Sequence, residues 1–107
     1  MAIIHMNTEL FQQAVKEEKP ALVEFWAPWC VYCRRIAPAL GKLAEEYGDA
    51  LTVGQVNIDE EPALAQQEKI ELVPTMILFQ GGEAKGSIVA PDSKAKIEAL
   101  IQEHVGK

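Results

Sequence analysis

Residues 21–33 read ALVEFWAPWCVYC and carry most of the information about the fold. The first seven of them are almost continuously apolar, which is typical of a central strand covered on both faces, as in a parallel sheet. Cys30 and Cys33 follow directly and are the only cysteines in the chain. Two thiols at this spacing can close into a disulfide and reopen. The segment therefore predicts a buried strand that leads into a two-electron redox pair.

The length and composition of the chain are those of a globular domain. It has 107 residues, of which 49% are hydrophobic and 24% charged, and we expect residues 1–107 to form a single domain. A net charge of −6 argues against nucleic acid as a partner. No apolar run reaches the ~20 residues of a membrane helix. We expect a monomer that binds neither nucleic acid nor membrane.

The N-terminal residues 1–9 lack the basic start and long apolar stretch of a signal peptide, so we expect a cytoplasmic protein. In a reducing cytosol, a close cysteine pair is more often catalytic or metal-binding than structural. Zinc needs about four ligands, and the remaining candidates, His5 and His104, lie at opposite ends of the chain. A structural disulfide that closes so small a loop would stabilise little. A redox role is the favoured interpretation.

Hydrophobic periodicity and turn residues predict the other elements. The expected strands are residues 3–6, 21–27, 51–58, 75–79 and 84–89, and the expected helices are residues 8–18 after a cap at Asn7 or Thr8, 30–47 before Gly48, 60–67, and one that follows a cap at Asp92 or Ser93. Leu10, Phe11, Ala14 and Val15 should form the apolar stripe of the first helix, and the last helix should carry Ile97, Leu100, Ile101 and Val105 on one face. Gly81-Gly82 suits a tight hairpin turn. The order β-α-β-α-β-α-β-β-α predicts a mixed sheet with helices on both faces.

Cys30 is expected where a strand ends and a helix begins. Free backbone N–H groups and the positive end of the helix dipole stabilise a thiolate there. Residues i and i+3 share one helix face, so Cys33 can reach Cys30. We expect Cys30 to attack and Cys33, one turn further in, to resolve the mixed disulfide. Arg34 and Arg35 add positive charge nearby, and at least one of them should point into solvent.

Glu24 is a charged residue in the middle of the apolar strand. A buried carboxylate is costly unless it is paired, and burial should raise its pKa. Such an acid near a thiol pair can carry protons during exchange. The equally weighted alternative is that Glu24 reaches the margin of the sheet or makes a structural pair.

Val73-Pro74-Thr75 places a proline at the start of a strand, where its missing N–H is tolerated. Taken alone, a trans bond is expected, because only ~5% of X-Pro bonds are cis.

In this order, these features resemble the thioredoxin family over nearly the whole chain. The matching motifs are Phe25-Trp26-Ala27-Pro28-Trp29-Cys30 followed by Cys33, Ile36-Ala37-Pro38, Val56-Asn57-Ile58-Asp59, Val73-Pro74-Thr75, and Phe79 with Gly82. The resemblance implies an α/β fold, the thioredoxin fold, with a central mixed five-stranded sheet flanked by four helices. It implies dithiol–disulfide exchange that reduces protein disulfides, without a metal or organic cofactor.

The resemblance also implies roles for individual residues. Cys30 would be the nucleophile, Cys33 the resolving thiol and Glu24 the buried acid beneath them. A reductase of the thioredoxin-reductase type would supply the electrons.

The same resemblance implies a substrate-binding groove around the cysteines. Pro74 would be a cis-proline that faces the disulfide, and the Val73 backbone would pair with an extended substrate segment. Trp29 would flank the sulfurs. Ala90 stands where a glycine usually lies, and its Cβ is expected to narrow the groove.

The chain departs from the usual thioredoxin pattern at two further places, and alternative functions remain open. The usual Gly-Pro between the cysteines is replaced by Val31-Tyr32, so a disulfide oxidase or isomerase is a second hypothesis. A binding module whose groove rather than its thiols carries function is a third. Gln55 replaces the lysine that commonly partners the buried acid, which should raise the pKa of Glu24 further.

Overall fold

The computed structural model describes residues 3–105. Residues 1–2, from the segment considered above for a signal peptide, and residues 106–107, from the end of the expected domain, lie outside the described residues. The strands are β1 (Ile4–His5), β2 (Ala21–Trp26), β3 (Thr52–Asn57), β4 (Thr75–Gln80) and β5 (Glu83–Val89), and the helices are α1 (Thr8–Lys16), α2 (Val31–Tyr47), α3 (Pro62–Gln67) and α4 (Lys94–Val105), with a 3-10 turn at Gly48–Ala50. This is the predicted order of elements.

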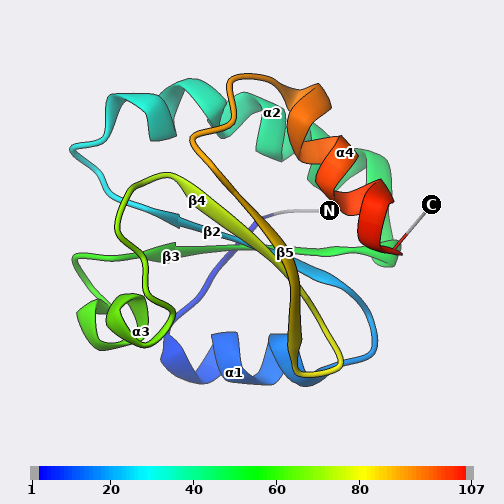
Figure 1. Cartoon of the computed structure of the whole chain (residues 1–107), viewed down its shortest axis with the longest axis horizontal. Helices are drawn as coiled ribbons and strands as arrows, with labels where there is room; N and C mark the ends of the chain where they lie inside the picture. The colour runs from blue at the N-terminus through cyan, green and yellow to red at the C-terminus, as the bar shows by residue number, and fades with distance from the viewer. Residues whose placement is uncertain (1–2, 106–107) are drawn as a thin grey trace.

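The five strands form one mixed sheet in the order β1-β3-β2-β4-β5. Strands β1, β3 and β2 run parallel to one another. Strand β4 is antiparallel to β2, and β5 is antiparallel to β4. Helices α2 and α4 cover one face of the sheet, and α1 and α3 cover the other (Figure 1). The predicted fold class, a mixed sheet flanked by four helices, is confirmed.

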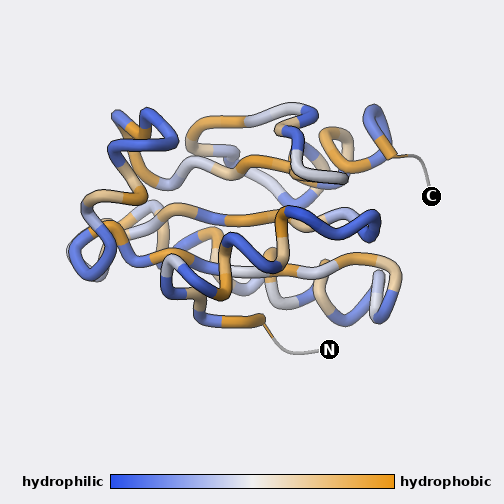
Figure 2. Tube along the Cα trace, turned by 90° about the horizontal axis from the view of Figure 1, so that it is seen from below, coloured by the Kyte–Doolittle hydropathy of each residue, from blue (hydrophilic) through white to orange (hydrophobic). Residues whose placement is uncertain are grey.

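Strand β2 lies in the middle of the sheet, and its first five residues are buried. Successive side chains point to opposite faces. Leu22 packs into the cluster beneath α2 and α4, whereas Val23 and Phe25 pack into the cluster that contains residues of α1 and α3. Figure 2 shows orange hydrophobic and blue hydrophilic stretches alternating along the outer segments of the trace, as expected of elements with one covered face.

Helix α1 begins as predicted but differs from the prediction at its end and at Leu10. Asn7 caps it, since its side chain accepts a hydrogen bond of 2.9 Å from the N–H of Leu10. The helix ends at Lys16, two residues early, because Glu17 is already extended. Leu10 was expected in the apolar stripe that packs on the sheet, but 42% of it is exposed. It lies about 100° around the helix from Phe11, which is the buried centre of the stripe.

The C-terminal half follows the prediction closely. Gly81 and Gly82 have φ values of 61° and 85°, which lets them turn the hairpin between β4 and β5. The Ser93 hydroxyl accepts a hydrogen bond of 3.3 Å from the N–H of Lys96, so Ser93 rather than Asp92 caps α4. Within residues 3–105, no helix combines the length and the hydropathy needed to cross a membrane.

Candidate active site

The two cysteines lie at the start of α2, just beyond the end of β2. Cys30 is the N-cap of the helix, with φ −89° and ψ 112°, and its sulfur accepts a hydrogen bond of 3.1 Å from the backbone N–H of Cys33. Both cysteines are free thiols in this structure. A negative charge on the Cys30 sulfur would face the unsatisfied N–H groups and the positive end of the helix dipole. The N-cap position therefore places the Cys30 sulfur where backbone N–H groups can donate to it.

Cys33 lies deeper, and only 3% of it is exposed. Burial, together with the hydrogen bond to Cys30, raises the pKa of the Cys33 thiol to about 12. Cys33 consequently holds its proton at neutral pH. It needs a base, or the loss of the negative charge at Cys30, before it can attack.

Glu24 lies inside the sheet and is completely buried. In the strand register it sits between Gln55 on β3 and Met76 on β4. The Gln55 side-chain amide donates a hydrogen bond of 2.8 Å to Oε1 of Glu24, while Oε2 has no hydrogen-bond partner among residues 3–105. Burial raises the pKa of Glu24 to about 7, although the Gln55 hydrogen bond acts in the opposite direction. The alternative that Glu24 reaches the margin of the sheet is wrong.

The segment before β4, which contains Val73 and Pro74, lies against the Cys30 sulfur. The Val73–Pro74 bond is cis, as the resemblance implied and contrary to the base rate. The Cys30 thiol lies 3.7 Å from the carbonyl oxygen of Val73, to which it can donate. The Pro74 carbonyl in turn accepts a hydrogen bond of 2.8 Å from the N–H of Ala90, whose φ is 47°. These contacts connect Val73, Pro74 and Ala90 to the thiol pair.

Trp29 stands beside the pair and is 64% exposed. Its indole N–H donates a hydrogen bond of 3.1 Å to the carboxylate of Asp59. Asp59 belongs to one of the motifs recognised in the sequence, but its contact with Trp29 was not foreseen. A hydrogen bond between residues 30 positions apart leaves no signal in local spacing.

A surface of exposed apolar side chains adjoins the cysteines. Its members, each more than half exposed, are Trp29, Val31, Tyr32 and Leu72. Leu72 directly precedes Val73 and was missed as a site residue. Several exposed apolar side chains near one site are typical of a place where another chain can bind. Within residues 3–105, no group of three or more His, Cys, Asp or Glu side chains is arranged to hold a metal ion.

Fold and site together define a class of protein: a redox-active dithiol at a helix N-terminus, opposite a cis-proline and near a buried acid. The thioredoxin family model matches residues 2–103. The chain is 43% identical over 91 residues to the thioredoxin of Alicyclobacillus acidocaldarius subsp. acidocaldarius, covering 85% of this chain and 87% of that protein. It is 42% identical over 101 residues to the thioredoxin of Acidithiobacillus ferridurans, covering 94% of each. The solved structure of Malassezia sympodialis thioredoxin (Mala s 13) matches with a TM-score of 0.88 at 28% identity, over 96% of this chain and 90% of that chain.

The chain belongs to the thioredoxin family. It is a thiol–disulfide oxidoreductase that reduces protein disulfides, as the resemblance implied.

Proposed function

We propose that Cys30 is the nucleophile and Cys33 the resolving thiol of this protein-disulfide reductase. The observation that carries the proposal is the position of Cys30 at the N-cap of α2, with its sulfur accepting the N–H of Cys33. An attacking thiolate is stabilised there, whereas Cys33 is protonated and buried.

The reaction consists of two exchanges. The Cys30 thiolate attacks one sulfur of the substrate disulfide, forms a mixed disulfide and releases the other substrate sulfur as a thiolate, which takes up a proton. Cys33 then loses its proton and attacks the Cys30 sulfur, and the second substrate thiolate leaves. The products are a reduced substrate and a Cys30–Cys33 disulfide, so two electrons have passed to the substrate.

Glu24 is proposed as the group that accepts the Cys33 proton. With a pKa of about 7 it is present both as acid and as carboxylate at neutral pH. In the resting protein, the interaction with Cys30 helps to raise the pKa of Cys33. Formation of the mixed disulfide removes the Cys30 charge, so the proton becomes easier to remove when Cys33 has to attack.

Trp29, Val73, Pro74 and Ala90 are proposed as the substrate-binding residues. The Val73 backbone, next to the Cys30 sulfur, can pair with an extended substrate segment. We propose that the Cβ of Ala90, which is hydrogen-bonded to the Pro74 carbonyl through its N–H, narrows this groove. We further propose that residues 1–107 act as a single, monomeric, cytoplasmic domain, that nucleic acid and membranes are not partners, and that a thioredoxin-reductase-type donor restores the dithiol.

Reduction of insulin by dithiothreitol tests these roles. We expect the wild type to accelerate it, and Cys30→Ser to lose the acceleration. Cys33→Ser should form the first bond but fail to release it, so a mixed disulfide through Cys30 should accumulate and be visible by mass spectrometry. Full activity in Cys30→Ser would overturn the assignment. For Glu24, we expect Glu24→Gln to slow exchange between pH 6 and 9, and unchanged rates would remove it from the mechanism.

A further inference from the structure

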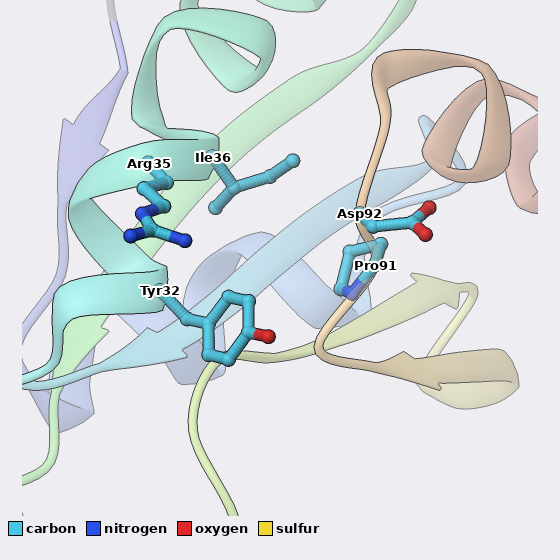
Figure 3. Close-up of a pocket in the computed structure, with 5 residues that line it drawn as sticks. All are labelled: Tyr32, Arg35, Ile36, Pro91 and Asp92. Atoms are coloured by element: carbon cyan, nitrogen blue, oxygen red, sulfur yellow. The ribbon is translucent and has the colours of Figure 1, made fainter.

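A pocket of about 290 Å³ lies between the first turns of α2 and the loop that precedes α4 (Figure 3). Tyr32, Arg35 and Ile36 of α2 form one side, and Pro91 and Asp92, from the loop between β5 and α4, form the other. None of these residues has a part in the chemistry proposed above.

The pocket adjoins the groove that would hold the substrate. Tyr32 directly precedes Cys33 in the chain, and Pro91 directly follows Ala90. The N–H of Ala90 donates a hydrogen bond to the Pro74 carbonyl. The side of the pocket that contains Pro91 is therefore linked to the Val73–Pro74 segment beside Cys30. A substrate segment bound through its cysteine to Cys30 therefore passes close to this pocket.

The unpaired charge in the pocket is positive. Arg35 is exposed, its guanidinium carbon lies 5.8 Å from the centre of the Tyr32 ring, and it forms no salt bridge with any residue in the described range 3–105. The Asp92 carboxylate is bound to Lys96 at 3.1 Å. Figure 3 shows that carboxylate directed away from Arg35. The pocket thus presents a free guanidinium beside an aromatic ring.

We propose that this pocket is a subsite for an acidic side chain, Asp or Glu, of the disulfide-bearing substrate segment; the proposal rests on the proposed function of Cys30. A guanidinium can donate two parallel hydrogen bonds to a carboxylate, and the cation–π contact with the Tyr32 ring holds Arg35 at the pocket. Ile36 and Pro91 supply apolar contacts for the methylene groups of the acid. An extended chain advances at most about 3.5 Å per residue, so peptides with the acid up to three residues from the substrate cysteine sample roughly 10 Å on either side of it.

The net charge of the protein separates a local contact with Arg35 from a general attraction of acidic peptides. At −6, the molecule as a whole repels acidic peptides. A preference for an acidic neighbour of the disulfide must therefore come from a local contact, and Arg35 is the cation that lines the pocket.

Matched peptide disulfides test the subsite. Each carries either Glu or Gln at one of the three positions on either side of the attacked cysteine, and stopped-flow fluorescence gives kcat/KM. For the wild type, we expect the Glu peptide to be favoured about threefold at the best position, as for an exposed ion pair. The ratio should fall to about 1 in Arg35→Gln and at high salt.

Arg34→Gln is the control, because it changes the net charge equally on an exposed neighbour that does not line the pocket. It should keep the threefold ratio. The subsite is overturned if no position prefers Glu in the wild type, or if Arg34→Gln removes the preference as fully as Arg35→Gln does.

The Gln peptides separate this proposal from the catalytic one. If the wild type does not reduce them, the assignment of Cys30 fails, and the pocket is then tested by binding alone. In NMR titrations with peptides that carry Ser in place of Cys, the Glu peptide should bind about threefold more tightly than the Gln peptide and shift the Arg35 side-chain signal. Equal binding of the two peptides would refute the subsite.

Discussion

The side-chain amide of Gln55 donates a hydrogen bond of 2.8 Å to Oε1 of Glu24, across neighbouring parallel strands in the interior of the sheet. A neutral donor stabilises the carboxylate less than a cation would, and it leaves the charge of Glu24 uncompensated. The outcome is a carboxyl group whose pKa is raised to about 7 by burial. The charge of Glu24 is also one of the causes that raise the pKa of Cys33, so the pair bears on stability and on the proton transfer proposed above.

Glu24 should make the stability of the protein depend on pH. Its pKa is 4.5 in the reference state and about 7 in the folded protein, so between these values the folded state keeps a proton that the unfolded chain releases. The free energy of unfolding therefore falls as pH rises from about 4.5 to about 7 and is constant above that range. At 1.36 kcal/mol per pKa unit, the loss is about 3 kcal/mol.

Glu24→Gln does not titrate and should lack this loss. Urea unfolding of the reduced wild type and variant at pH 4.5 and pH 8 measures the difference between them. The same pH dependence in both proteins would show that Glu24 is not the group responsible.

Replacing Gln55 by lysine should lower the pKa of Glu24. A cation in hydrogen-bonding distance of a carboxylate typically lowers its pKa by about 1–3 units. Titration of the ¹³C-labelled Glu24 carboxyl by NMR measures the change. Gln55→Leu, which removes the donor without adding charge, is the control and should move the pKa upward.

The two thiols should differ sharply in reactivity. The pKa of Cys33 is about 12, so very little thiolate is present at Cys33 at pH 7. We expect iodoacetamide to modify Cys30 ~100-fold or more faster than Cys33 in the reduced protein. Peptide mapping by mass spectrometry identifies the modified residue, and comparable labelling of both would contradict the assignment of Cys30 as the attacking thiol.

Ala90 occupies a backbone conformation that favours glycine. With φ at 47°, a residue that bears a Cβ is disfavoured by roughly 1 kcal/mol. Glycine avoids this strain but loses more chain entropy on folding, so we expect Ala90→Gly to stabilise the protein slightly, by about 0.5 kcal/mol.

Ala84→Gly, in strand β5, is the matched control. It removes the same methyl group where no strain is relieved and should destabilise by roughly 0.5–1 kcal/mol. Urea unfolding compares the two variants. An equal loss of stability in both would mean that the backbone at Ala90 is not strained.

Much of the fold was predictable because its signals are local. A continuous apolar run implies a strand buried on both faces, and β2 is central in the sheet. A tight hairpin turn needs positive φ angles, which Gly81 and Gly82 adopt easily, and the turn is found there. The error at Leu10 has a physical reason: periodicity shows that a helix has an apolar face, but the sheet it packs against decides how wide the covered part of that face is.

Some features of the active site were likewise predictable from local sequence, and others depend on the tertiary structure. The spacing of Cys30 and Cys33 and their place after a strand follow from neighbours in the chain, because helix periodicity and capping act over a few residues. The complete burial of Glu24, the identity of its partner Gln55 and the pocket formed by Tyr32, Arg35 and Asp92 depend on the packing of segments far apart in the chain. Desolvation and charge pairing are set by these distant contacts. The pKa values of Glu24 and Cys33 and the unpaired charge of Arg35 therefore follow from the tertiary structure and not from local sequence.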